Sequence, residues 1–189
     1  GISLLEIYNK IINDNFILES TPGGLQVSAG GAVANNIHGK DCFKNGYFEN
    51  NVISIKYIDS TGNIDEVTKN NTNKFENIFG SMGLFCVILE VKIKLKKVKS
   101  LELETITKKV YSIEEMVRSF DDKNLYKYDY AVGWIDCFDK KNIGRGLFRK
   151  AKFADIKNKF FIKKMKKNKK FLFLNNDLMI TLLSFIYNR

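Results

Sequence analysis

The stretch that decides the fold runs from residue 23 to residue 40 and reads GGLQVSAGGAVANNIHGK. It holds five of the thirteen glycines of the chain and its only histidine, His38. Apolar and polar residues alternate over 25–29, a pattern that predicts a short strand. The pair Gly30-Gly31 would then free the backbone, and a short helix would open over 32–34. A glycine turn between a strand and a helix leaves N–H groups directed at one spot, so we expect a phosphate site here.

His38 lies between this turn and Lys40. If the turn holds a pyrophosphate, the imidazole and the ammonium group would lie close to the rest of the ligand, so we interpret both as active-site residues. The alternative is an ordinary hydrogen-bonded histidine in a loop. No catalytic triad is possible within the chain except through His38. His38 and Cys42 are two potential zinc ligands without a second pair, so we expect no metal site.

The composition fits a packed core, with 44% hydrophobic and 28% charged residues. Three cysteines, odd in number and far apart, indicate reduced thiols. The chain starts at a glycine and stops inside an apolar run over 178–187, so we expect a piece of a longer protein. That run is shorter than the ~20 residues a membrane helix needs. We expect the cytoplasm or a membrane surface, with export left open.

The net charge of +10 is unevenly distributed. From Lys150 to Lys170 the chain has ten lysines and a single acid, Asp155. The run Lys163–Lys170 is interpreted either as a solvated face or as a contact with an anionic membrane surface. Phenylalanines bracket these lysines and do not alternate with them, which suits an interfacial contact better than base stacking. We therefore expect no nucleic-acid partner.

The remaining pattern is a series of hairpins with short helices, which predicts an α+β fold without regular βαβ repetition. A helix is expected over 2–12, and shorter ones over 74–79 and 113–120. Strands are expected over 16–18, 52–59, 64–68, 85–98, 101–110, 128–138 and 143–149. In the long strand, alternate residues from Val87 to Leu95 are expected to share one face. The composition changes near residues 99–100, which we take as a domain boundary.

The segment Gly30–Lys40 resembles the FAD-binding segment of the PCMH-type, or vanillyl-alcohol-oxidase, flavoproteins. The likeness continues at residues 46–52, 59–62, 79–84, 130–136 and 144–146, and covers the chain to about Arg149. It implies that residues 1–99 form the second subdomain of a PCMH-type FAD-binding domain, a mixed sheet with short helices. Residues 100–189 would begin a substrate domain built on an antiparallel sheet.

The resemblance implies noncovalent FAD. The positions that contact FAD in the family correspond to Gly23, Ser28, Ala29, Gly30, Gly31, Asn35, Asn36, Ile37, His38 and Ile88. Gly39, Lys40 and Trp134 correspond to the substrate pocket, with His38 and Lys40 as active-site residues and the general base outside this chain. The alternative for Trp134 is a core tryptophan on a strand. Cys86 stands where the family has a glycine.

The branch of the family that the chain is most similar to oxidises a sugar hydroxyl on a polyprenyl-phosphate-linked pentose, for cell-envelope polysaccharide synthesis. This implies a lipid-linked sugar substrate and a short-chain reductase partner. One alternative within the family is an aldonolactone or alditol oxidase. An alternative of another class is a non-catalytic basic module that binds a membrane or nucleic acid.

Overall fold

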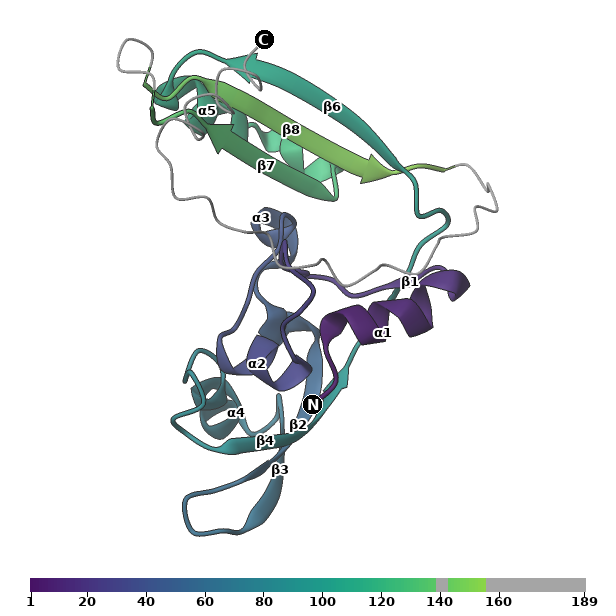
Figure 1. The fold of residues 1–189 in the computed structure, drawn as a ribbon, viewed down its shortest axis with the longest axis vertical. Helices are drawn as coiled ribbons and strands as arrows, with labels where there is room; N and C mark the ends of the chain where they lie inside the picture. Colours follow the sequence, from purple (N-terminus) through teal and green to yellow (C-terminus); the bar gives the residue numbers. More distant parts are fainter. Residues whose placement is uncertain (139–142, 156–189) are drawn as a thin grey trace. The chain divides into compact units, whose positions relative to one another are not determined.

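The computed structural model describes residues 1–138 and 143–155. Within these ranges the chain forms two compact units (Figure 1). The first comprises Gly1–Glu102 and takes up the chain again at Phe153, and the second lies between them, over Leu103–Lys152. The predicted run Lys163–Lys170 lies outside the described residues.

The first unit opens with helix α1 (Leu4–Ile11), closed by the 3-10 turn η1 (Ile12–Asp14). Ser3 Oγ accepts a hydrogen bond from the Glu6 N–H, and the Glu6 carboxylate accepts one from the Ser3 N–H at 2.8 Å, a capping box. Asn15 then takes a left-handed conformation, and strand β1 (Phe16–Ile17) follows. The helix predicted over 2–12 and the strand predicted at 16–18 are confirmed.

The sheet of the first unit has the order β3-β2-β4, with both neighbours antiparallel to the central strand. Its strands are β2 (Val52–Ile58), β3 (Ile64–Thr68) and β4 (Val87–Ile93), and helix α4 (Thr72–Ile78) joins the last two. On β2, Ile55 pairs with Val67 on one side and Val91 on the other. The predicted hairpin and the short helix after it are confirmed.

The long strand predicted over 85–98 is wrong in two respects. It breaks after β4, and β5 (Lys96–Lys97) pairs instead with β1. A bulge also interrupts β4, because Lys56 pairs with Glu90 while its neighbour Tyr57 pairs with Ile88. The extra residue, Leu89, reverses the alternation, so that Ile88 packs against the core and Leu89 is 45% exposed.

The strand predicted over 25–29 is absent. Its residues form a turn whose carbonyls cap α1, since Val27 O and Leu25 O accept the N–H groups of Leu4 and Leu5, each at 2.9 Å. These are orphan donors of a helix N-terminus, and the turn satisfies them. Helix α2 (Ala29–Ala34) begins before the glycine pair, which lies inside its first turn.

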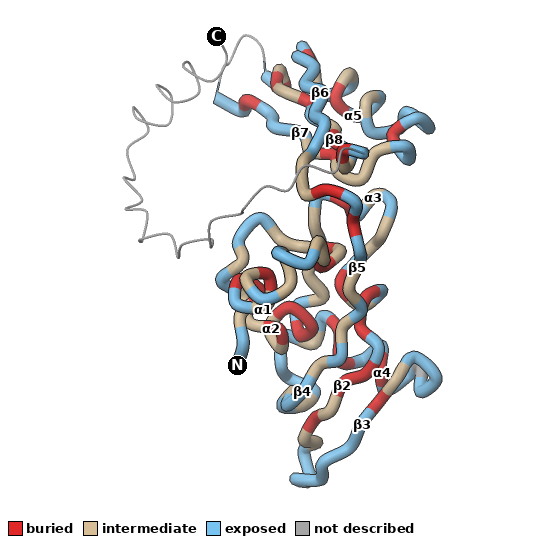
Figure 2. Tube along the Cα trace, turned by 90° about the vertical axis from the view of Figure 1, so that its right-hand side faces the viewer, coloured by how far each residue is buried: buried red, intermediate tan, exposed pale blue. Residues whose placement is uncertain are grey.

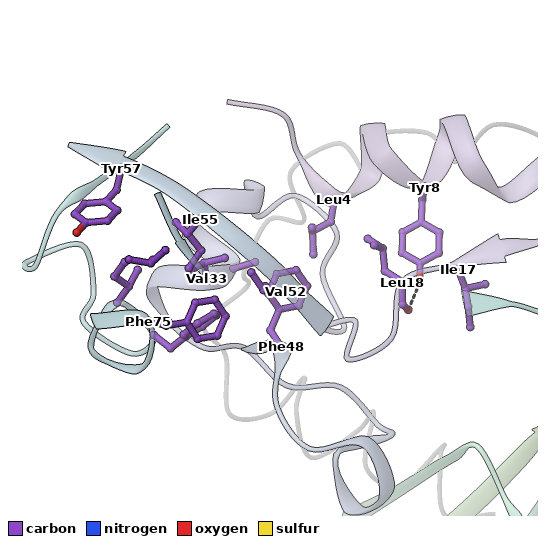
Figure 3. Packing of buried hydrophobic residues seen from close by; sticks show 14 of the residues in the cluster. Leu4, Tyr8, Ile17, Leu18, Val33, Phe48, Val52, Ile55, Tyr57 and Phe75 are labelled. Atoms are coloured by element: carbon purple, nitrogen blue, oxygen red, sulfur yellow. Dashed lines mark hydrogen bonds between the residues drawn. The ribbon is translucent and has the colours of Figure 1, made fainter. Parts of the chain in front are cut away.

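The core of the first unit lies between the sheet and the short elements that cover it (Figure 3). Besides α1 and α2, these are η2 (Phe48–Asn51) and α4, while α3 (Cys42–Asn45) is formed by a loop before η2. Phe48, Leu4, Val33 and Ile55 are fully buried. The buried positions recur along β2 and α2 in Figure 2. Burial of large apolar side chains such as these supplies most of the stabilisation of a domain this small.

The second unit is a three-stranded antiparallel sheet with the order β6-β8-β7. The strands are β6 (Leu103–Val110), β7 (Tyr130–Ile135) and β8 (Gly146–Phe153), with α5 (Ile113–Asp121) and η3 (Lys123–Lys127) between the first two. Helix α5 packs on one face of the sheet, where the rings of Phe120 and Phe148 meet edge to face, their centroids 4.9 Å apart. The predicted antiparallel hairpin and the helix over 113–120 are confirmed.

The chain leaves the first unit and returns to it at one place. The Ala154 N–H donates to the Glu102 carbonyl at 2.9 Å, and Lys99 pairs with Asp155, also at 2.9 Å. The two ends of the segment Leu103–Lys152 are therefore held together. The domain limits expected from sequence, 1–99 and 100–189, stay predictions. Within the described ranges, no helix has the length and apolar character needed to cross a membrane.

Candidate functional site

A groove of about 690 Å³ opens between the N-terminal turn of α2 and strand β4. Small residues and backbone form one wall, and apolar side chains form most of the other. The first wall includes Gly1, Ser28, Ala29, Gly30 and Gly31, and the second includes Cys86, Ile88, Leu89, Val91 and Ile93. Five residues predicted to contact FAD therefore share one groove, namely Ser28, Ala29, Gly30, Gly31 and Ile88.

The N-terminal turn of α2 determines which donors face this groove. Ser28 is the N-cap, and its Oγ accepts the Gly31 N–H at 3.1 Å, while the Ala29 N–H donates to the Ile2 carbonyl. The Gly30 N–H makes no hydrogen bond with any described residue. The glycine turn was expected to present several free N–H groups, and the cap reduces them to one. The hydroxyl hydrogen of Ser28 adds a second donor.

Gly30 leaves room at this wall. A Cβ built there would meet only Ile88, at an ordinary contact distance of 3.7 Å. The fold therefore does not require glycine at this position for its own packing. A free N–H on an uncrowded backbone beside a hydroxyl fits the oxygen atoms of a phosphate.

The β4 wall is apolar and carries little charge. Ile88 and Val91 are half-buried there, and burial raises the pKa of the Cys86 thiol, which keeps it protonated at neutral pH. Glu90 pairs with Lys56 at 3.2 Å. None of the described residues that line the groove is a lysine or arginine. The two walls thus fit a ligand with both a phosphate and an aromatic part, as FAD has.

The loop that follows α2 displays His38 outward. Ile37 turns inward to pack on the core, and its carbonyl accepts the Phe48 N–H at 2.9 Å. His38 pairs with Tyr47 in an isolated bridge, and the Tyr47 ring meets the imidazole edge to face, with centroids 5.9 Å apart. Lys40 is exposed and forms no ion pair within the described part of the chain.

Gly39, between these two side chains, is required for packing. A Cβ at this position would collide with Asp41 Oδ1 and would lie 2.6 Å from the Thr21 carbonyl oxygen. No other residue fits there without moving the loop. The contact of Gly39 with substrate stays a prediction. The fold itself requires a glycine at this position.

The side-chain amides of Asn35 and Asn36 form hydrogen bonds within the chain. Asn35 Nδ2 donates to the Gly31 carbonyl at 2.9 Å, at the end of the helix. Asn36 has a φ of 41° and exchanges two hydrogen bonds with Glu49, one to its carboxylate and one from its N–H. Gly23 lies exposed at a bend, in open space. The FAD contacts assigned to these three residues stay predictions.

Trp134 belongs to the second unit, on β7, where it pairs with Leu147. Its side chain is 41% exposed, so the alternative of a core tryptophan is wrong. Gly146 packs directly on the Trp134 carbonyl, and a Cβ there would collide with it. This contact accounts for the second glycine of the Gly144-Arg145-Gly146 segment.

Two features of the site were not predicted from the sequence. Gly1 and Ile2 line the groove because the backbone of Ile2 receives the Ala29 N–H. Asp41, only 2% exposed, lies under the His38 loop and accepts hydrogen bonds from Ser20 and Asn45. The only sequence signal for Asp41 is its place directly after His38-Gly39-Lys40.

Comparisons with known proteins agree with this geometry. A family model described as an FAD binding domain matches residues 1–68. The decaprenylphosphoryl-β-D-ribose oxidase of Mycolicibacterium smegmatis is 24% identical over 159 residues, which are 82% of this chain and 35% of that protein. An uncharacterized protein in the mprA 5′ region of Streptomyces coelicolor is 23% identical and covers 71% of this chain and 36% of its own length.

A solved structure shares the fold. BBE-like #28 from Arabidopsis thaliana superposes with a TM-score of 0.57 at 22% identity, covering 82% of this chain and 32% of that one. The chain thus spans about a third of the length of these relatives. The match over residues 1–68 identifies an FAD binding domain, and the relatives and the shared fold support the PCMH-type, or vanillyl-alcohol-oxidase, superfamily of flavoproteins, with FAD as the cofactor.

Proposed function

We propose that this chain is part of an FAD-dependent oxidoreductase that oxidises a sugar hydroxyl, with a polyprenyl-phosphate-linked pentose as substrate. The groove between α2 and β4 is the observation that carries the proposal. It joins the free Gly30 N–H and the Ser28 hydroxyl to the apolar wall at Ile88. The similarity to an oxidase named for a decaprenylphosphoryl-ribose supports the choice of substrate.

In this proposal the first wall of the groove holds the pyrophosphate of FAD, and Ile88 covers an aromatic ring. Bound FAD supplies the acceptor for the hydride removed from the substrate carbon. His38 and Lys40 stand at the flavin ring and the substrate. Lys40 is exposed without an ion-pair partner in the described part of the chain, so its ammonium is available to a substrate phosphate. The base that takes the hydroxyl proton lies outside these residues.

The groove is tested by titrating the purified chain with FAD and following the quenching of flavin fluorescence. Gly30→Val fills the groove, while Gly24→Val adds the same atoms at a position with no neighbour within 4 Å and serves as the matched control. We expect saturable binding that Gly30→Val abolishes and Gly24→Val preserves. Equal binding by both variants would contradict the assignment of the groove.

The substrate is tested with the whole protein under anaerobic conditions. A polyprenyl-phosphoryl pentose should bleach the oxidised flavin, while sugar lactones and alditols should not. Bleaching by a lactone or alditol alone would favour the aldonolactone or alditol oxidase alternative. A protein that purifies without flavin and binds none would favour the non-catalytic basic module.

The proposal includes a membrane-surface contact through Lys163–Lys170 and a short-chain reductase partner, with the protein in the cytoplasm or at the membrane. A lipid-linked substrate gives both a rationale, because its carrier stays in the bilayer while the oxidised sugar must be reduced afterwards. Each lysine near an anionic surface contributes about 1 kcal/mol. Charge reversal at Lys163, Lys164, Lys166 and Lys167 should therefore abolish flotation with anionic vesicles. Unchanged flotation would remove the membrane contact.

A further inference from the structure

Asp41 is a buried carboxylate with one oxygen unsatisfied. Its side chain is 2% exposed, and its Oδ2 accepts hydrogen bonds from the Ser20 N–H at 2.8 Å and from Asn45 Nδ2 at 3.0 Å. Its Oδ1 is also buried and has no hydrogen-bond partner among the described residues. A buried polar atom without a partner is unfavourable, so its presence calls for a physical reason.

The unsatisfied oxygen lies against the loop that carries His38 and Lys40. Asp41 Oδ1 and the Thr21 carbonyl oxygen both occupy the space that a side chain at position 39 would need. Gly39 therefore fits between Asp41 and Thr21, with the exposed side chains of His38 and Lys40 on either side of it. This close contact fixes the path of the loop backbone between Asp41 and Thr21.

The segment that receives Asp41 is itself fixed. The Tyr8 hydroxyl donates to the Leu18 carbonyl at 3.0 Å, as Figure 3 shows, and lies 2.7 Å from Thr21 Oγ1. Ser20 has a φ of 52°, and its hydroxyl donates to the Gly46 carbonyl at 3.2 Å. The Ser20 N–H donates to Asp41 from a fixed position, because the segment is held by Tyr8 of α1 and by the bond from the Ser20 hydroxyl to Gly46.

We propose that Asp41 is a positioning residue that locks the loop Ile37–Lys40 onto the segment Leu18–Thr21, so that His38 and Lys40 are held ready for flavin and substrate. The role toward flavin rests on the proposed function. The lock acts through the acceptor Oδ2 and not through the charge. An asparagine keeps that acceptor and removes the charge.

The single histidine gives a direct readout. NMR of the imidazole carbon-bound protons reports the state of the His38 loop without FAD. Asp41→Ala removes the acceptor, and Asp41→Asn keeps it. Asp59→Ala is the matched control. Asp59, like Asp41, accepts N–H hydrogen bonds, in its case from the backbone of Thr61 and Asn63, but it lies in the turn between β2 and β3.

We expect the His38 signals of Asp41→Ala to move toward those of an unstructured histidine, while Asp41→Asn and Asp59→Ala keep the wild-type signals. The dissociation constant for FAD should rise about tenfold in Asp41→Ala, the effect of one lost hydrogen bond, and should stay unchanged in the other two. A folded Asp41→Ala with unmoved His38 signals would overturn the proposal. So would an Asp41→Asn whose His38 signals are displaced, and this variant decides if Asp41→Ala does not fold.

The NMR arm separates this inference from the proposed function. If the wild-type chain binds no FAD but Asp41→Ala still displaces the His38 signals, the positioning role stands and the flavin assignment falls. If FAD binds and the His38 signals do not depend on Asp41, the positioning role falls alone.

Discussion

The N-terminal turn of α2 and the loop Ile37–Lys40 come from one glycine-rich stretch, yet they use glycine for opposite purposes. At Gly30 the space beside the backbone is open toward the groove. At Gly39 the space is filled by Asp41 and the Thr21 backbone. Within one glycine-rich stretch, a glycine therefore leaves room for a ligand at one position and allows close packing of the backbone at another. The sequence does not distinguish these two roles.

The two regions also differ in their polar groups. The groove offers the Gly30 N–H and the Ser28 hydroxyl, with no lysine or arginine among its described lining residues. The loop displays an imidazole and an ammonium group above a buried polar cluster that includes Asp41 and Ser20. Substitution of Gly39 should therefore mainly change stability, while substitution of Gly30 should mainly change ligand binding.

The largest effect is expected for Gly39→Ala. The added methyl group would overlap Asp41 and the Thr21 backbone, and relief requires moving the loop. We expect a loss of about 3 kcal/mol in the free energy of unfolding, at the upper end of the cost of overpacking. Urea denaturation measures it, with Gly24→Ala as the control in open space. Equal stability of the two variants would show that the loop does not pack as described.

A smaller loss is expected for Tyr8→Phe, which removes the anchor of the segment Leu18–Thr21. The hydroxyl that contacts the Leu18 carbonyl and Thr21 is deleted, at a cost of about 1–2 kcal/mol. Burial raises the pKa of Tyr8 above that of an unfolded tyrosine. As the pH rises above about 10, the unfolded chain therefore ionises first and stability falls.

The pH dependence checks this prediction independently. Denaturation between neutral pH and pH about 11 should show a shallower decline in Tyr8→Phe than in the wild type. Burial, and after it Asp65, also raises the pKa of Tyr57, so this residue should contribute to the decline that remains in Tyr8→Phe. Parallel curves for the two proteins would mean that Tyr8 ionises as freely in the folded state as in the unfolded one.

Ser28→Ala tests the cap at the start of α2. Loss of the Oγ acceptor frees the Gly31 N–H and should lower the free energy of unfolding by about 1 kcal/mol. Ser28→Asp, which restores an acceptor, should recover the stability but weaken FAD binding by placing a negative charge at the groove. Recovery of both properties would mean that the pyrophosphate lies elsewhere.

The smallest effect on stability is expected for Gly30→Ala. Alanine favours a helix more than glycine does, and the new methyl group meets only Ile88, so stability should change by less than about 0.5 kcal/mol. The methyl group enters the groove, however, and should weaken FAD binding about tenfold, equivalent to about 1.4 kcal/mol. Flavin fluorescence titration measures this. The comparison of Gly30→Ala with Gly39→Ala separates a loss of ligand binding from a loss of packing within one glycine-rich stretch.

The sequence predicts most helices and strands because their periodicity is long enough to be distinctive. Helix α1, the hairpin β2–β3 and helix α5 follow from apolar spacing and capping residues. Prediction from the sequence fails where one local pattern fits two different structures. Leu25 and Val27 alternate as in a strand, but their carbonyls cap α1 and their side chains pack against the core from a turn.

The candidate site was predicted in its parts and not in its arrangement. Resemblance identified Ser28–Gly31 and Ile88, which the fold brings into one groove. Periodicity alone would place Ile88 opposite Val91, and the bulge at Leu89 is what turns both to one side. A bulge depends on pairing with the partner strand β2, so the local sequence pattern does not predict it. The burial of Asp41 depends likewise on Ser20, far away in the sequence.

The joint between Glu102 and Ala154 has a consequence for chain entropy. An inserted segment whose ends already meet adds only its loop-closure cost, which grows slowly with length. The segment between them can then lengthen, shorten or be exchanged for a tight turn while the groove between α2 and β4 keeps its fold. The single hydrogen bond at 2.9 Å, with the Lys99–Asp155 pair beside it, marks the place where such a graft should be made.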